Sequence, residues 1–265
     1  MDNVKILILS LVQGITELLP ISSSAHLILT GKLLNWDISS NTLLLAVLHI
    51  GTTLAIILFF RKELFKGFFT KKKWTFFLKL LIASLPTAII GLLFEDKISH
   101  FLRGNLIMAI SLIVVGILFI IAENIKIPSH DTDPENIPLW KMILIGIGQV
   151  LSLIPGVSRS GITILTGIAL GLEKYTSFSL SFMLGIPLLI GSNFYIIAKA
   201  YMLSDSINVT TASLSFVKML PIILVTFIVG YIALLVVKKF KKGKWLTIFG
   251  VYRILLGIFI LIFAI

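Results

Sequence analysis

Pro-Gly-Val-Ser-Arg-Ser-Gly, residues 155–161, interrupts an otherwise apolar stretch near the middle of this 265-residue chain. Residues 142–154 before it and 162–172 after it carry no charged side chain. An ionised residue in such surroundings faces a polar cavity rather than lipid. The forked guanidinium of arginine also matches a phosphate well. Arg159 therefore indicates an anion site within a membrane. The alternative is that Arg159 reaches the membrane interface and the glycines only pack helices.

The composition of the whole chain indicates an integral membrane protein. Hydrophobic residues make up 57% of the chain and charged residues 13%, whereas soluble domains carry about 25% charged residues. Mean hydropathy is +1.07. There is no cysteine, which excludes disulfides and thiolate chemistry. We expect one membrane domain over residues 1–265. Six apolar runs have the length of a membrane-spanning helix, ~17–25 residues: 41–60, 75–94, 105–122, 178–198, 217–237 and 245–265.

The positive charges predict the topology. The net charge is +11, but its cations crowd into loops 61–74 and 238–244 rather than forming a nucleic-acid surface. Both loops should be cytoplasmic. It follows that loops 95–104 and 201–216 lie outside, and that loops 123–140 and 171–177 lie inside.

Segments 4–30 and 141–170 are apolar but broken by proline and small polar residues. Segment 141–170 must enter and return, because the loops on both its sides are inside. By the same logic, 4–30 enters and returns from outside. Each arm has about 13 residues and a length of roughly 20 Å, which reaches the middle of a ~30 Å hydrocarbon core without crossing it.

The two interrupted segments open two similar halves, about 1–125 and about 139–265. Glu-Leu-Leu-Pro at 17–20 aligns with Ser-Leu-Ile-Pro at 152–155, and the serines that follow also align. Each half reads as one hairpin plus three spans, and three is odd, so the second copy is inverted. The prediction is an all-α polytopic membrane protein with an inverted-topology repeat, each half one re-entrant helical hairpin plus three transmembrane helices. Chance similarity between leucine-rich segments is the alternative.

Broken helices in inverted repeats place a substrate site near the membrane midplane. Ser22 and Ser158 stand where N-caps belong, after a proline and before an apolar helix. Each helix start would offer free N–H groups and a positive dipole to a phosphate.

The first hairpin carries candidate catalytic groups. Gln13 and Glu17 are four residues apart and share a helix face. A carboxylate in an apolar arm suits a general base. Ser23 is a candidate nucleophile, and His26 a candidate acid or orienting group. The simpler interpretation makes the serine run a turn and cap, and His26 a satisfied polar residue.

The second hairpin supplies the anion clamp. The candidate catalytic residues are Glu17, Ser23, His26 and Arg159. The candidate phosphate-binding residues are Gln13, Ser22, Ser24, Gly156, Ser158, Arg159, Ser160 and Thr163. His49, beside Gly51-Thr52-Thr53, is a further candidate to line the cavity. Arg253, within the last span, either binds a lipid phosphate or pairs with Glu123.

These residues resemble a known family. Residues 13–27, QGITELLPISSSAHL, resemble the first signature of the bacterial undecaprenyl-diphosphate phosphatases of the bacitracin-resistance type, and residues 155–163, PGVSRSGIT, resemble the second. The similarity in length and span order extends over essentially the whole chain. The family's first motif has Glu or Gln, three residues, then Glu. Here the pair is Gln13 and Glu17, which disfavours a metal site built from two carboxylates.

The resemblance implies hydrolysis of undecaprenyl diphosphate to undecaprenyl phosphate and inorganic phosphate, which recycles the lipid carrier of cell-wall synthesis and confers bacitracin resistance. It also implies two re-entrant hairpins, a plasma-membrane location and a site open to the outer face. A divalent cation, Mg²⁺ or Ca²⁺, is implied, with Glu17 as its candidate ligand. Whether the protein forms a homodimer is left open by the sequence.

In these terms Arg159 would hold the phosphates and Glu17 would activate Ser23 or a water. His26 would orient the substrate or donate a proton. The main alternative is a secondary transporter or lipid flippase for an anionic substrate, because inverted repeats also build transporters. The clustered Glu17, Ser23 and His26 favour hydrolysis, since a pure anion site has no use for a base. A structural scaffold would have no reason to bury Glu17 and Arg159.

Overall fold

The computed structural model describes residues 3–38, 41–94, 104–125, 133–204, 216–239 and 243–263. Every regular element in these ranges is a helix, and six of these helices are long and apolar enough to cross a membrane. They coincide with the six predicted spans, which are thereby confirmed as helices: α3 (Thr42–Phe59), α5 (Lys71–Leu93), α7 (Asn105–Asn124), α10 (Lys174–Ser204), α11 (Phe216–Lys239) and α12 (Trp245–Phe263). The predicted outer loops, 95–104 and 201–216, fall largely outside the described residues.

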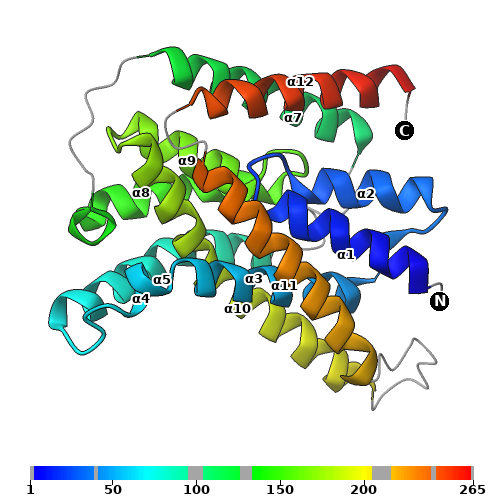
Figure 1. The fold of residues 1–265 in the computed structure, drawn as a ribbon, viewed down its shortest axis with the longest axis horizontal. Helices are drawn as coiled ribbons and strands as arrows, with labels where there is room; N and C mark the ends of the chain where they lie inside the picture. Colours follow the sequence, from blue (N-terminus) through cyan, green and yellow to red (C-terminus); the bar gives the residue numbers. More distant parts are fainter. Residues whose placement is uncertain are drawn as a thin grey trace.

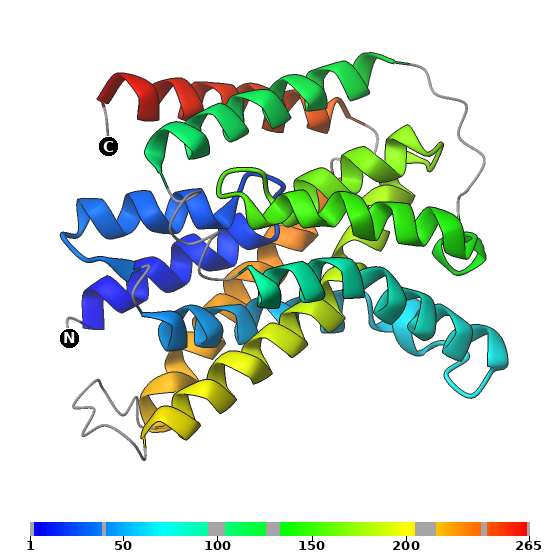
Figure 2. The same ribbon diagram turned by 180° about the vertical axis from the view of Figure 1, so that it is seen from behind.

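The two proline-broken segments form two helical pairs. The first consists of α1 (Asn3–Glu17) and α2 (Ser23–Leu33), and the second of α8 (Leu139–Gln149), the short 3-10 helix η3 (Val150–Leu153) and α9 (Arg159–Ala169). In both Figure 1 and Figure 2 the pairs approach from opposite ends of the molecule, and their turns come together near its centre. We call residues 18–22 the first turn and residues 154–158 the second turn.

The turns fold sharply because particular residues take left-handed backbone conformations. Ser22 has φ 73° and Ser158 has φ 71°. Gly156 has φ +94°, and a Cβ there would lie 2.4 Å from the Met108 carbonyl oxygen. Glycine is the residue that meets both demands without strain. The backbone therefore reverses in few residues, and each following helix starts at the turn.

The helices pack around the two turns. α7 and α12 run side by side along one edge (Figure 1). Their contact is close because Gly116 and Gly250 face each other, and a Cβ on Gly250 would lie 2.6 Å from the Gly116 carbonyl oxygen. α1 packs on α11, α8 packs on α5, and α3 contacts both α10 and α11. The helical pairs are thus held by spans from elsewhere in the chain.

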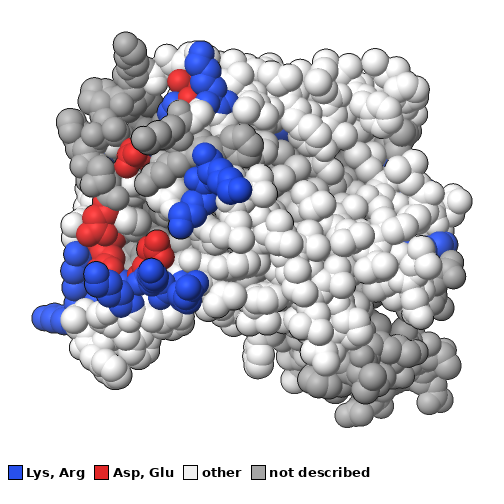
Figure 3. Space-filling view, viewed as in Figure 1, with Lys and Arg blue, Asp and Glu red and all other residues white. Residues whose placement is uncertain are grey.

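Charged side chains gather at one end of the molecule, and a broad face beside them is almost free of charge (Figure 3). This end contains α4 (Arg61–Phe65), the start of α5 and the 3-10 helix η2 (Pro134–Asn136). Lys73 of α5 is 1% exposed; it pairs with Glu135 and donates to the Glu63 carbonyl at 2.5 Å. The pairing fixes η2 against α5. Lys241 and Lys242, which were expected on the same side, lie outside the described residues.

Candidate active site

A polar cavity of about 160 Å³ lies where the two turns meet. All the residues that line it are polar except Leu189: Thr16, Glu17, Ser22, Ser23, Ser24, His49, Ser152, Ser158, Arg159, Ser160 and Leu189. Both helical pairs contribute, together with α3 and α10. Such a concentration of hydroxyl and ionisable groups inside an apolar molecule is the feature expected of a functional site in a membrane.

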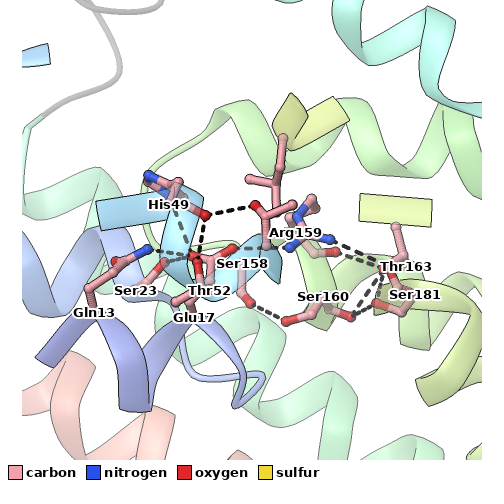
Figure 4. Close-up of polar contacts among 12 residues, drawn as sticks. Gln13, Glu17, Ser23, His49, Thr52, Ser158, Arg159, Ser160, Thr163 and Ser181 are labelled. Atoms are coloured by element: carbon pink, nitrogen blue, oxygen red, sulfur yellow. Dashed lines mark hydrogen bonds and ion pairs between the residues drawn. The ribbon is translucent and has the colours of Figure 1, made fainter. Parts of the chain in front are cut away.

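Glu17 is at the centre of the site (Figure 4). Its Oε1 accepts a hydrogen bond from Nη2 of Arg159 at 3.0 Å. Its Oε2 accepts one from Ser23 Oγ at 2.5 Å and lies 3.6 Å from Nε2 of His49. The Glu17 side chain is 7% exposed and that of Arg159 11%. The predicted base and the predicted anion clamp therefore form one buried ion pair that joins the two helical pairs.

Arg159 is held in place by α10. Its Nη1 donates to the Ser181 carbonyl at 3.3 Å. Gly185, one turn further along α10, leaves the space that the guanidinium occupies, since a Cβ there would lie 1.7 Å from Nη1. Sequence reasoning missed both α10 residues, because nothing local in the sequence reveals which side of α10 faces Arg159.

The serines behave differently in the two turns. Ser158 caps α9 as predicted, because its Oγ accepts from the Gly161 N–H at 3.2 Å. Ser22 precedes α2 as predicted but makes no side-chain cap; its hydroxyl lies 3.2 Å from that of Ser24. Ser22 therefore stands at the predicted N-cap position without forming a side-chain cap. The left-handed conformation of this residue turns its hydroxyl toward Ser24 and the cavity.

Three predicted phosphate-binding residues do not line the cavity. Gln13 is fully buried behind Glu17 and donates to Oε2 at 3.4 Å. Thr163 lies on the α10 side of α9, where its hydroxyl is 2.6 Å from Ser181 Oγ. The Gly156 carbonyl, in the second turn, accepts a hydrogen bond from Nη2 of Arg253. These residues support the lining from behind. The other five predicted members, Ser22, Ser24, Ser158, Arg159 and Ser160, do line it.

The two candidate histidines of the site differ in position: His49 lines the cavity, as the sequence suggested, and His26 does not. His26 is not among the lining residues; its Nδ1 donates to the Ser22 carbonyl at 2.7 Å, and its Nε2 lies 2.7 Å from the Tyr252 hydroxyl. His49, only a minor candidate in the sequence, lines the cavity beside Glu17. Its Nδ1 donates to the Leu45 carbonyl at 2.7 Å, which turns Nε2 toward the carboxylate. His49, rather than His26, is the histidine that faces Glu17 in the cavity.

Both alternatives for Arg253 are wrong. Its side chain is fully buried and bonds to backbone carbonyls of the two turns, so it reaches neither lipid nor Glu123. Glu123 instead pairs with Lys174 and accepts from the Leu246 N–H at 3.1 Å. The sequence indicated that Arg253 lies inside the membrane, but not that its partners are backbone atoms from distant segments.

Comparisons with known proteins find relatives that match nearly the whole chain. The family model described as bacitracin resistance protein BacA matches residues 6–259. Undecaprenyl-diphosphatase 1 of Shouchella clausii (strain KSM-K16) is 35% identical, over 99% of this chain and 97% of its own length. The undecaprenyl-diphosphatase of Corynebacterium glutamicum (strain ATCC 13032) is 35% identical over 98% of this chain and 89% of its own. That of Lactococcus lactis subsp. cremoris (strain SK11) is 34% identical over 100% and 98%.

Proposed function

This chain belongs to the family of bacitracin resistance protein BacA, and from that premise we propose that it hydrolyses undecaprenyl diphosphate to undecaprenyl phosphate and inorganic phosphate. It is a membrane phosphatase that recycles the lipid carrier of cell-wall synthesis and thereby confers bacitracin resistance. The observation that carries the assignment to this site is the contact of Glu17 with both Ser23 and Arg159 in a polar cavity.

The diphosphate binds between the two turns. Arg159 offers forked donors, and the starts of α2 and α9 offer backbone N–H groups and positive dipoles. The hydroxyls of Ser24 and Ser160 complete the lining. Phosphoryl transfer depends mainly on positioning and charge neutralisation, and this set of donors supplies both. The undecaprenyl chain remains among the apolar helices.

Ser23 is the nucleophile of the proposed reaction. Its Oγ is 2.5 Å from Glu17 Oε2, so the proton moves to Glu17 as Oγ attacks the terminal phosphorus. The bond from phosphorus to the bridging oxygen breaks, and undecaprenyl phosphate leaves. Water then hydrolyses the phosphoserine, releases phosphate and restores the serine. His49, 3.6 Å from Glu17, exchanges protons with it between the two steps.

The residues of this site provide only some of the ligands that a divalent cation needs. No group of three or more metal-ligating acidic, histidine or cysteine side chains occurs among the described residues. The cavity does offer oxygen donors in the Glu17 carboxylate and the Ser23 hydroxyl. Behind Glu17, the Gln13 Oε1 atom is buried without a hydrogen-bond partner. Mg²⁺ commonly binds one or two carboxylates plus substrate phosphate. When bound here, Mg²⁺ or Ca²⁺ would neutralise phosphate charge beside Glu17.

The inverted repeat and the re-entrant hairpins belong to the same proposal. Their support is the exchange of partners between halves: α1 of the first half packs on α11, and α8 of the second packs on α5. The two turns also approach from opposite ends (Figure 2). We assign the charged end in Figure 3 to the cytoplasm, because lysine and arginine side chains gather there. The active site then opens to the outer face of the bacterial plasma membrane.

The test is phosphate release by purified protein in detergent. We expect hydrolysis of undecaprenyl diphosphate by the wild type, none by Ser23→Ala, and trapping of a phosphoserine at residue 23 after rapid acid quenching. Hydrolysis with no phosphoserine would assign the attack to water. No phosphate release from any polyprenyl diphosphate would favour the transporter, which needs a closed membrane and leaves its substrate intact.

A further inference from the structure

Arg253 is a fully buried cation in the middle of α12 that bonds to the backbone of both turns. Its Nη1 donates to the Pro20 carbonyl of the first turn at 3.0 Å. Its Nη2 donates to the carbonyls of Gly156 and Val157 in the second turn, at 2.6 and 2.9 Å. One planar group therefore spans the junction of the two helical pairs from the side of α12.

These three carbonyls need a donor. A broken backbone in a membrane protein must be satisfied by protein or water, because lipid offers no hydrogen bonds. The turn carbonyls cannot be paired along a helix, since α1 has ended and α9 has not begun. Arginine supplies several donors in a fixed plane, so a single side chain can satisfy carbonyls on two separate segments.

The surroundings of Arg253 do not explain its charge in any other way. Among the described residues no carboxylate forms an ion pair with it, and its guanidinium lies over the Phe119 ring at 5.7 Å. Burying a cation without a counter-ion is costly, and an apolar residue would pack in the same place at less cost. The positive charge of Arg253 is explained if the role of this residue is to bond the carbonyls of both turns.

The neighbouring residue reaches the first turn as well. The Tyr252 hydroxyl is 2.7 Å from Nε2 of His26, the rings stack with an interplanar angle of 5°, and Nδ1 of His26 donates to the Ser22 carbonyl. α12 thus contacts the first turn at Pro20 and, through His26, at Ser22. Both contacts lie between Glu17 and Ser23 in the sequence.

We propose that Arg253 is a positioning residue that holds the two turns together, so that Glu17 and Ser23 from one meet Arg159 from the other. The proposal rests on the phosphatase function above. The three hydrogen bonds described for Arg253 all go to backbone carbonyls of the turns and none to a cavity-lining side chain. Loss of Arg253 should therefore separate the reacting groups without removing any of them.

The experiment compares Arg253→Met and Arg253→Lys with Lys73→Met, a matched control that also removes a buried cation but at the charged end of the molecule. The chain has no cysteine, so spin labels can be added at Ile15 and Leu151 alone. Both positions are exposed, at 45% and 49%, and each lies in an arm that leads to one of the turns. Double electron–electron resonance reports their separation, and phosphate release from undecaprenyl diphosphate reports kcat and KM.

For Arg253→Met we expect a longer and broader label distance, and a kcat lower by on the order of 100-fold, the effect of about 1 Å of misplacement. KM should rise by a smaller factor, because every phosphate-binding group is still present but the two turns that bear these groups lie further apart. Arg253→Lys should recover part of the kcat and narrow the distance distribution. Lys73→Met should lower the melting temperature without altering either readout.

A wild-type distance and kcat in Arg253→Met would overturn the proposal. So would a loss of activity in Lys73→Met as large as that in Arg253→Met, since it would trace the effect to general destabilisation. If Arg253→Met does not fold, Arg253→Lys with the same labels decides. If the wild type releases no phosphate, the proposed function fails, whereas the label distances still test the connection between the turns.

Discussion

At the scale of single residues, the Glu17–Arg159 pair links stability to chemistry. Glu17→Gln removes the base, and we expect a loss of phosphate release of about 10²–10⁴-fold. It also leaves Arg159 buried without a counter-charge, which should lower the free energy of unfolding by about 3–5 kcal/mol. The double variant Glu17→Gln/Arg159→Met should regain thermal stability but no activity. A double variant less stable than Glu17→Gln would contradict the pairing.

The two histidines give a second prediction at this scale. His49 faces Glu17 in the cavity, whereas His26 is bound to Tyr252 and the Ser22 backbone. We expect His49→Gln to lower kcat by about 10²-fold or more, the range for proton transfer. Tyr252→Phe removes a hydrogen bond of His26 while leaving every lining residue, so it should cost much less. Equal losses in the two variants would place His26 in the proton path.

The sequence predicted which residues belong to the site better than it predicted the directions in which their side chains point. Glu17 and Arg159 were found because each is a charge inside an apolar stretch, and charge at that depth is informative alone. His49 lines the cavity, as the sequence suggested, whereas Thr163 does not. Which face of a helix lines a cavity depends on its packing partners, and the local sequence does not show them. His26 does not line the cavity, because its ring is bound to the Ser22 carbonyl and to the hydroxyl of Tyr252, a partner from α12 that no local pattern reveals.

At the scale of elements, the packing of Arg159, from α9, against α10 requires a glycine at position 185. A Cβ there would lie 1.7 Å from Arg159 Nη1, so Gly185→Ala must displace the guanidinium from Glu17. We expect a loss of phosphate release approaching that of Arg159→Met. Gly191→Ala is the matched control on the same helix, because a Cβ at Gly191 meets nothing within 4 Å. Normal activity in Gly185→Ala would show that the guanidinium can act from another position.

The sequence predicted the elements more completely than their contacts. Six spans follow from the length of apolar runs, and the broken segments follow from Pro20 and Pro155 with their polar neighbours. The contacts between distant segments did not follow. Arg253 binds carbonyls that any residue could supply, so no sequence pattern identifies its partners. Close approaches such as that of Gly116 and Gly250 also appear only once the helices are placed.

At the scale of the whole molecule, the orientation in the membrane decides which side the substrate enters from. The loop between α4 and α5 belongs to the charged end, and Phe69 within it is 95% exposed. α2 ends toward the opposite end of the molecule (Figure 1), and Leu33, its last residue, is 75% exposed. If the lysine-rich end is cytoplasmic, α2 ends at the outer face, and the first helical pair dips inward from that side.

Cysteine labelling tests this orientation in intact cells, because the chain without introduced cysteines offers no background. A membrane-impermeant maleimide should label Leu33→Cys from outside and should reach Phe69→Cys only after permeabilisation. The reverse pattern would place the α1–α2 pair on the cytoplasmic side and would contradict a site open to the outer face. The control is a cytosolic protein with an accessible cysteine, which the maleimide should leave unlabelled in intact cells. If the maleimide labels that protein, the cells are leaky and labelling of Phe69→Cys does not report topology. In the proposed role, undecaprenyl diphosphate appears on the outer leaflet. The expected labelling pattern would therefore place the active site on the side of the membrane where its substrate is found.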